Sequence, residues 1–172
     1  YTPLEQAKVQ YAYRTSSLAT NYMAHKNTVE TDQESSLVQA VSKYVRVTGD
    51  KTILEERIAG VAVRDRLGQA LHYVLTQRFD PEHGLAWGAT TADWGDVQPE
   101  SPWGVTLDAH SHRALDIYDN AMMEIALNDY LHLLGPKAPE AARWQKARDD
   151  LKRNIRSHLW DAQRQKFIPH LY

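Results

Sequence analysis

The chain has no cysteine among its 172 residues, which excludes disulfide bonds, thiolate metal sites and cysteine nucleophiles. Charge of one sign is not in excess either, because 20 Lys and Arg balance 22 Asp and Glu for a net charge of −2. No basic stripe, basic amphipathic segment or long apolar run is present, so we expect neither a nucleic-acid nor a membrane partner. Without a visible signal peptide, and with Tyr1 in first place, the sequence fits the cytoplasm and a bacterial secreted or periplasmic space equally.

What the sequence does contain is helical spacing of apolar residues, which predicts an all-α fold around one core. A second helix should begin at a Thr31–Glu34 capping box and end at Gly49. Its apolar stripe is Leu37, Val38, Val41, Tyr44 and Val45. A third helix should begin at a Thr52–Glu55 box and run to about Gln77.

The remaining elements are predicted by the same signals. Pro3 opens a first helix that reaches about Tyr22, although its alternating residues would also suit a strand. A fourth helix runs from about Ile117 to Gly135, and a fifth opens at Pro139 and extends to about Leu159. The tail, residues 166–172, is expected to be extended.

An internal repeat links the second and fourth helices. Ala40, Tyr44 and Gly49 recur 86 positions later as Ala126, Tyr130 and Gly135, both in the pattern A-x3-Y-x4-G. Each copy continues into another helix and then an aromatic–Asp pair, at 79–80 and at 160–161. A helical hairpin of this kind needs stacked neighbours to bury its apolar face. The alternative is that two amphipathic helices align by coincidence.

The segment between these helices carries the residues best suited to chemistry. Asp93, Trp94, Gly95 and Asp96 form a D-W-G-D motif, and three of the five tryptophans lie between Trp87 and Trp103. A carboxyl group beside a flat indole suits acid catalysis on a sugar, because the indole packs on the C–H face of the ring. The alternative is a loop whose Trp side chains fill a core edge and whose Asp side chains cap turns.

The motifs taken together resemble those of the six-hairpin glycosidases. They are Y-x-x-x-T-G-D (44–50), G-L-x-W (84–87), D-W-G-D (93–96) and D-N-A-M (119–122). That superfamily of α/α-toroid enzymes includes trehalases, processing glucosidases, rhamnosidases and cellobiose phosphorylases. The likeness extends from about Thr28 to Leu134, but Tyr118 and Gly95 stand where many members have Asp and Asn.

The resemblance implies a fold and a mechanism. Residues 1–172 would form two to three of the six hairpins of a toroid, as part of a longer polypeptide whose remainder completes the domain. Asp96 would be the general acid of an inverting glycoside hydrolase acting on an oligosaccharide or small glycoside. Asp93 would orient Asp96 or bind a sugar hydroxyl, and the general base would lie outside this segment, ~6.5–9.5 Å from the acid.

Further residues are candidates for binding the carbohydrate substrate. Glu30 and Asp32 precede a helix that would face the cleft, although capping explains residues at such a place equally well. Trp87, Trp94 and Trp103 would stack on sugar rings or pack the loop, and Asn120 would reach a hydroxyl. Asp108, His110 and His112 have a spacing that can bind metal, but no further ligand is evident, so we expect neither metal nor cofactor.

Two other function classes remain open. A carbohydrate-binding helical module would use the three tryptophans without turnover. A toroid polysaccharide lyase would use Tyr118, Asn120 and His110 for β-elimination, and its unsaturated product would absorb in the near ultraviolet. The chain lacks a basic cluster for uronate carboxylates, which favours the hydrolase over the lyase.

Overall fold

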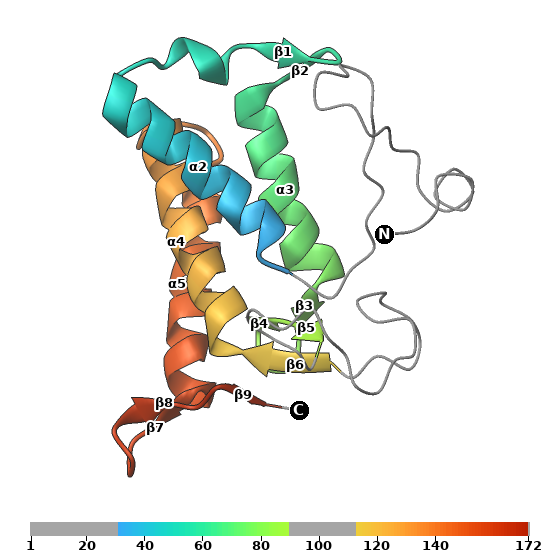
Figure 1. Ribbon diagram of the computed structural model, residues 1–172, viewed down its shortest axis with the longest axis vertical. Coiled ribbons are helices and arrows are strands. Elements are labelled where there is room, and N and C mark those ends of the chain that lie inside the picture. Colours follow the sequence, from blue (N-terminus) through green and yellow to red (C-terminus); the bar gives the residue numbers. More distant parts are fainter. Residues whose placement is uncertain (1–30, 90–112, 172) are drawn as a thin grey trace, which may run out of the picture.

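Four helices form the body of the protein in a computed structural model that describes residues 31–89 and 113–171. They are α2 (Gln33–Thr48), α3 (Val63–Gln77), α4 (Ile117–Leu134) and α5 (Ala141–His158). Successive helices run in opposite directions, so α2 and α4 both begin at the lower end of the molecule in Figure 1. The described part is therefore mostly helical, as expected. The helix predicted between Pro3 and Tyr22 lies outside the described residues.

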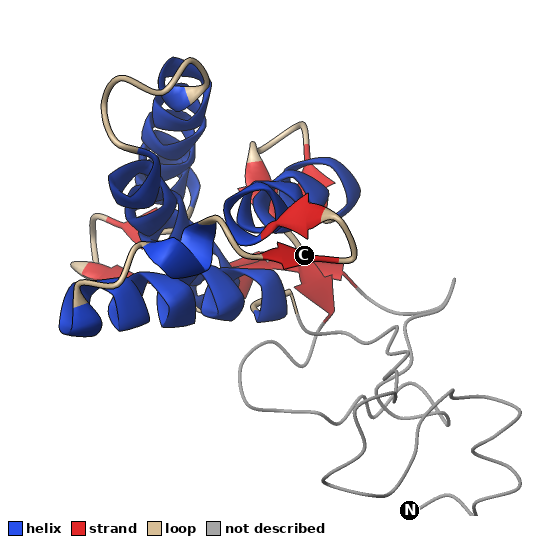
Figure 2. Ribbon diagram, turned by 90° about the horizontal axis from the view of Figure 1, so that it is seen from above, coloured by secondary structure: helices blue, strands red, loops and turns tan. Residues whose placement is uncertain are grey.

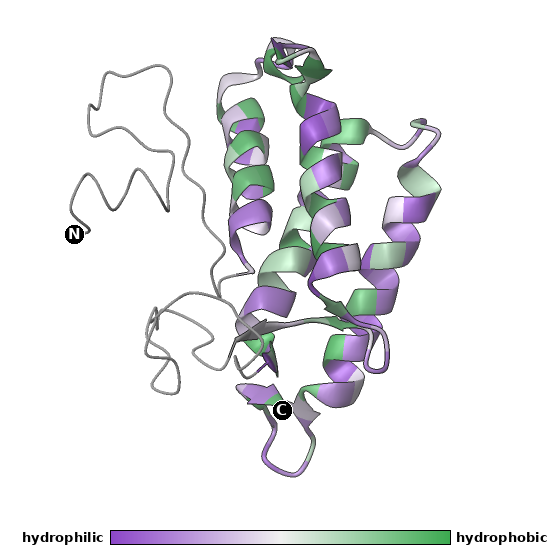
Figure 3. Cartoon of the chain, turned by 90° about the vertical axis from the view of Figure 1, so that its right-hand side faces the viewer, coloured by the Kyte–Doolittle hydropathy of each residue, from purple (hydrophilic) through white to green (hydrophobic). Residues whose placement is uncertain are grey.

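Helix α4 is the centre of the core, because it packs against each of the other three helices. Its buried apolar side chains include Met123 and Leu127, both fully buried. The outer helix α5 is more polar and contributes Trp144, Leu151 and Ile155 to the same core. Figure 3 shows this mixture of polar and apolar surfaces on the helices.

Helix α2 ends where the sequence predicts, but it begins differently. Gly49 has a φ of 72° and its N–H donates to the Val45 carbonyl, which confirms the predicted left-handed stop. The Thr31–Glu34 capping box is wrong, because Thr31 donates its hydroxyl to the carbonyl of Trp87 at 2.9 Å instead. A contact with a distant part of the chain thus replaces the local cap.

The predicted apolar stripe of α2 is only partly buried. Val38 and Val45 lie in the core, whereas Leu37 and Tyr44 are 49% and 42% exposed. The buried face is completed by two serines, Ser35 and Ser42. A row of apolar side chains therefore remains on the open side of the helix.

The third helix starts later than predicted. Residues before it form a 3₁₀ turn, η1 (Thr52–Leu54), and a small hairpin of β1 (Arg57–Ile58) and β2 (Val61–Ala62). Thr52 does not cap a helix, since its N–H and hydroxyl both donate to Asp50 Oδ1, at 2.8 and 2.6 Å. Ala59 and Gly60 make the hairpin turn with φ values of 49° and 80°. The predicted end at Gln77 is confirmed.

The described part contains two repeat units, the first with α2, α3, β3 (Phe79–Asp80) and β4 (Leu85–Ala86) and the second with α4, α5, β7 (Trp160–Asp161) and β8 (Lys166–Phe167). In each unit a helical hairpin is followed by a β-hairpin of the same geometry, since β3 pairs with β4 in the first and β7 pairs with β8 in the second. The residues flanking each pair add one equivalent backbone bond, Trp87 N to Arg78 O and Ile168 N to Leu159 O, both 2.9 Å. This correspondence, at a constant spacing of 81 positions, confirms the repeat predicted from the sequence.

A three-stranded antiparallel sheet lies at the end where α2 and α4 begin. Its order is β5 (Gly88–Ala89), β6 (Arg113–Asp116) and β9 (His170–Leu171), so the strands that leave the two β-hairpins flank the strand that enters α4. The predicted extended tail is confirmed for β8 and β9. Figure 2 shows the strands as short pieces beside the helices, not as a central sheet.

Candidate functional site at the shared end of α2 and α4

The N-termini of α2 and α4 lie together and are joined by a hydrogen bond. The Tyr118 hydroxyl donates to Asp32 Oδ2 at 2.9 Å, across 86 residues of sequence. Thr31, one residue earlier, is tied to the carbonyl of Trp87. The first turns of α2 and α4 therefore lie at the same end of the molecule. Asp32 and Tyr118 are both half-buried there.

Helix α4 is capped by Asp116, the last residue of β6. Asp116 Oδ1 accepts a hydrogen bond from the Asp119 backbone N–H at 2.7 Å, a normal N-cap contact. The N–H of Ile117 donates to the carbonyl of Pro169 at 2.9 Å, next to β9. Both Asp116 and Asp119 are buried, at 1% and 5% exposure. The start of α4 is therefore fixed by contacts from both repeat units.

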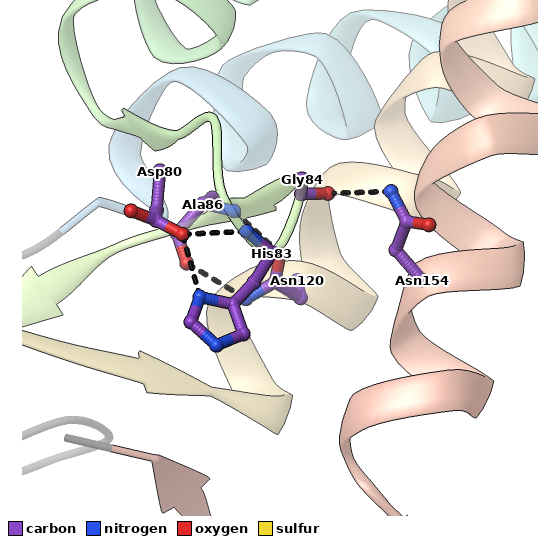
Figure 4. Close-up of polar contacts among 6 residues, drawn as sticks. All are labelled: Asp80, His83, Gly84, Ala86, Asn120 and Asn154. Atoms are coloured by element: carbon purple, nitrogen blue, oxygen red, sulfur yellow. Dashed lines mark hydrogen bonds and ion pairs between the residues drawn. The ribbon is translucent and has the colours of Figure 1, made fainter.

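Asn120 uses its whole amide group to join β4 to α4. Its Oδ1 accepts from the backbone N–H of Ala86 at 2.7 Å, and its Nδ2 donates to the carbonyls of Ala86 and Asp116 at 2.9 and 2.7 Å (Figure 4). The side chain is fully buried. We therefore assign Asn120 a positioning role and leave it out of the substrate contacts proposed below. This contact is tertiary, so the sequence alone offered no signal for it.

Trp87 is also a packed residue. It is 8% exposed, and the guanidinium groups of Arg78 and Arg113 lie 4.9 and 4.2 Å from the centre of its ring. Cation–π contacts of this kind hold the indole in place. Trp87 thus connects the first β-hairpin to β6, and it leaves little ring surface for a sugar.

The D-W-G-D loop is closed at its base beside these helix ends. Gly88 pairs with Ala114 and Ala89 pairs with Arg113, so the chain leaves and re-enters the described fold at neighbouring positions of one sheet. Residues 90–112 lie outside the described part, and they include Asp93, Trp94, Asp96 and Trp103 as well as Asp108, His110 and His112. Glu30 also lies outside it.

The β3–β4 turn adds a carboxylate–imidazole pair that sequence reasoning missed. Asp80 Oδ2 accepts from the backbone N–H and from Nδ1 of His83, both at 2.8 Å (Figure 4). Burial alone would raise the pKa of Asp80, but these His83 contacts outweigh it and hold that pKa below its ordinary value. The His83 ring also packs edge-on against His158 of α5, 5.1 Å between centres. The sequence signal for this contact was the D-x-x-H spacing that begins at the Asp of the aromatic–Asp pair.

A cavity lies at the other end of the molecule. It has a volume of about 770 Å³ and lies where α2 and α4 finish and α5 begins, lined by Arg46, Lys51, Asp129 and Arg148 among others. Asp32, Trp87 and Asn120, which are the predicted substrate contacts within the described residues, do not line it. Within residues 31–89 and 113–171 we find no cluster of three His, Asp or Glu side chains placed to bind a metal ion. In those same ranges no helix has the length and apolar character needed to cross a bilayer.

Comparison of the chain with models of known protein families and with curated proteins gives no match. The geometry at the shared end of α2 and α4 is therefore the basis for a functional proposal.

Proposed function

We propose that the chain is part of the catalytic domain of an α/α-toroid glycoside hydrolase of the six-hairpin type. The observation that carries this proposal is the pairing of β5 with β6, the two strands that flank the D-W-G-D segment in the sequence, beside the first turns of α2 and α4. In a helical-hairpin toroid, a cleft lined by helix N-termini and the loops between them is where substrate would bind. The confirmed repeat supports the same architecture, because two stacked units of one design are what a toroid requires.

In this proposal the loop supplies the acid. Asp96 protonates the leaving glycosidic oxygen, and Trp94 provides the apolar wall that keeps a carboxyl group protonated near neutral pH. Asp93 orients Asp96 or binds a hydroxyl. A carboxylate from a later part of the polypeptide activates water on the opposite face of the sugar, with inversion at the anomeric carbon, ~6.5–9.5 Å from the acid.

Asp32 is the described residue best placed to bind a sugar hydroxyl. Its Oδ2 accepts the Tyr118 hydroxyl, which holds the carboxylate in one orientation at the helix end. Glu30 and Trp103 complete the proposed substrate contacts. The full commitment of the Asn120 amide to Ala86 and Asp116 weighs against a lyase, since that residue then has no donor left for a uronate group.

The experiment is to replace Asp96 by Asn in the full-length polypeptide and to compare an aryl glycoside with the natural sugar. The substitution keeps the shape of the side chain and removes its proton. We expect kcat/KM on the sugar to fall ~10²–10⁴-fold. The loss should be much smaller on the aryl glycoside, because a good leaving group needs little protonation.

Asp93→Asn is the matched control, since it removes a charge from the same motif. We expect it to impair both substrates by a similar factor. If Asp93→Asn shows the dependence on leaving group and Asp96→Asn does not, the two roles are reversed. If neither variant loses activity, this loop is not the acid-bearing part of a glycosidase.

A further inference from the structure

The two repeat units present the same β-hairpin to different surroundings. In the first unit Leu85 and Ala86 of β4 are fully buried. Their equivalents in the second unit, Lys166 and Phe167 of β8, are exposed, Phe167 to 44%. The backbone geometry is shared, so what differs is the element that covers the hairpin.

The first hairpin is covered by the second unit through three contacts. The Asn120 amide brackets the N–H and C=O of Ala86, Asn154 Nδ2 donates to the Gly84 carbonyl at 3.1 Å, and His158 packs on His83 (Figure 4). The β4 strand thus lies against α4 and α5 together.

None of these contacts has a counterpart at the second hairpin within the described residues. The equivalent positions are Phe167, Gln165 and Arg164, and the contacts of Gln165 and Arg164 stay inside their own turn, with Ala162 and Asp161. Phe167 pairs with Trp160 as Ala86 pairs with Phe79. In a pair of this kind the two residues do not hydrogen-bond each other, so the backbone N–H and C=O of Phe167 point away from β7. Another group can bind both of them there.

We propose that the β7–β8 hairpin is the docking surface for the first turn of a further helix of the same repeat, and that a carboxamide side chain in that turn binds the N–H and C=O of Phe167. A carboxamide carries an acceptor and a donor on two separate atoms, which is how Asn120 binds the N–H and C=O of Ala86 in the first unit. A carboxylate lacks the donor and an ammonium lacks the acceptor. The occupant is a third helical hairpin of the same polypeptide. On this point the inference rests on the proposed function, in which the chain continues beyond two units.

The exposed aromatic pair at this surface fits the same occupant. Trp160 and Phe167 pack edge-to-face with 5.0 Å between ring centres and are 38% and 44% exposed. In the first unit, Phe79 and Ala86 at these two positions are covered, half-buried and fully buried. An incoming helix that buried Trp160 and Phe167 would gain apolar contact around the central amide.

Hydrogen exchange of the Phe167 amide tests the proposal directly. We expect this amide to exchange at least about tenfold more slowly in the full-length polypeptide than in residues 1–172 alone, because only the longer protein carries the third unit. The Ala86 amide is the internal control and should be protected in both proteins. Equal exchange at Phe167 in the two proteins would overturn the proposal, and so would protection in residues 1–172 that grows with concentration, which would identify a second copy as the occupant.

A pair of substitutions separates docking from damage to the hairpin. Phe167→Pro removes the N–H, while Phe167→Ala keeps it and reproduces the residue of the first unit. In the full-length polypeptide we expect Phe167→Pro to lower the folding equilibrium constant about 10- to 100-fold more than Phe167→Ala. In residues 1–172 the two variants should be equally stable. An equal proline penalty in both proteins would show hairpin distortion and overturn the proposal. Glycosidase activity is not read in either assay, so loss of the hydrolase assignment would leave these outcomes unchanged.

Discussion

Single residues join the two repeat units, and most of them act through backbone groups of the other unit. Asn120 brackets Ala86 and Asn154 bonds Gly84 across the two units, whereas Thr31 bonds the Trp87 carbonyl within the first unit. Sequence reasoning assigned Thr31 to a local cap and Asn120 to a sugar. Thr and Asn side chains can hydrogen-bond to many kinds of group. In this fold the partner of each is a backbone group more than 30 residues away in the sequence.

Gly68 of α3 is required by Tyr130. A Cβ atom added at Gly68 would lie 2.5 Å from the Tyr130 hydroxyl oxygen, and the Tyr130 ring is fixed by its edge-on contact with Trp144. We expect Gly68→Ala to lower the free energy of unfolding by ~1–3 kcal/mol despite the better helix propensity of alanine. Urea denaturation measures the change.

Tyr130→Phe supplies the control for this prediction. Removing the hydroxyl relieves most of the close contact, so Gly68→Ala in that background should be nearly neutral or stabilising by up to ~1 kcal/mol. A penalty of the same size in both backgrounds would mean that Tyr130 is not the obstacle.

Asp80 makes the stability of the first β-hairpin dependent on pH. Its folded pKa is lowered below the ordinary value of 3.8, so the contribution is fully present above that pH. The contribution is lost as pH falls through the lower folded pKa, because a protonated carboxyl no longer accepts both bonds from His83. We expect Asp80→Asn to cost ~1–2 kcal/mol at pH 7. The difference from the wild type should shrink below pH 3.8, as measured by denaturant unfolding across pH; a constant difference would contradict the linkage.

Elements were predicted well where their signals are local and poorly where they are not. Gly49 and Gly135 end α2 and α4 as expected, because a stop at positive φ depends on one glycine; Gly49 is left-handed and Gly135 has φ 78° and ψ 159°. The β1–β2 hairpin was missed, because Ile58 and Val61 fit a helical stripe and only the Ala59–Gly60 turn breaks it. The sequence motifs identified candidate residues for the site. Only the internal repeat indicated that the starts of α2 and α4 would lie together.

The two β-hairpin turns offer a matched test of backbone strain. Gly84 and Gln165 occupy the same turn position with φ values of 64° and 53°. A Cβ atom at Gly84 would also run into Asn154, whereas Gln165 lies in an exposed turn. A non-glycine residue in the left-handed conformation costs ~1–2 kcal/mol. We expect Gly84→Ala to lower the free energy of unfolding by more than this, because of the additional clash with Asn154.

The reciprocal substitution should have the opposite sign. Gln165→Gly removes the left-handed strain without removing a core contact, so it should stabilise the protein by ~0.5–1 kcal/mol. Thermal denaturation of both variants measures the pair. A destabilised Gln165→Gly would show that the bond from its side chain to Ala162 outweighs the strain.

At the scale of the whole molecule, the described part is open on two sides. Leu37, Tyr44 and Val47 of α2 are exposed, although the equivalent residues of α4 are Met123, Tyr130 and Leu133, of which the first two are buried. Trp160 and Phe167 of the second β-hairpin are exposed as well. Two units of a stacking repeat are expected to leave such faces uncovered.

This openness leads to a prediction for residues 1–172 as an isolated protein. We expect this segment to hydrolyse no glycoside, because the general base of the proposed mechanism lies in a later unit. The assay is product release from an aryl glycoside, with the full-length polypeptide as the positive control. Efficient turnover by the monomeric segment would show that both carboxylates lie within these 172 residues.

The closure of residues 90–112 by the β5–β6 pair has a consequence for how such a protein can change. Because Ala89 and Arg113 are directly paired, the intervening segment can lengthen, shorten or be exchanged without moving either helical unit, and the entropy of closing it grows only slowly with length. The scaffold and the segment proposed to carry the reactive groups can therefore diversify at different rates. A lineage could acquire a new substrate preference by rewriting this one insertion, and a laboratory could attempt the same by grafting.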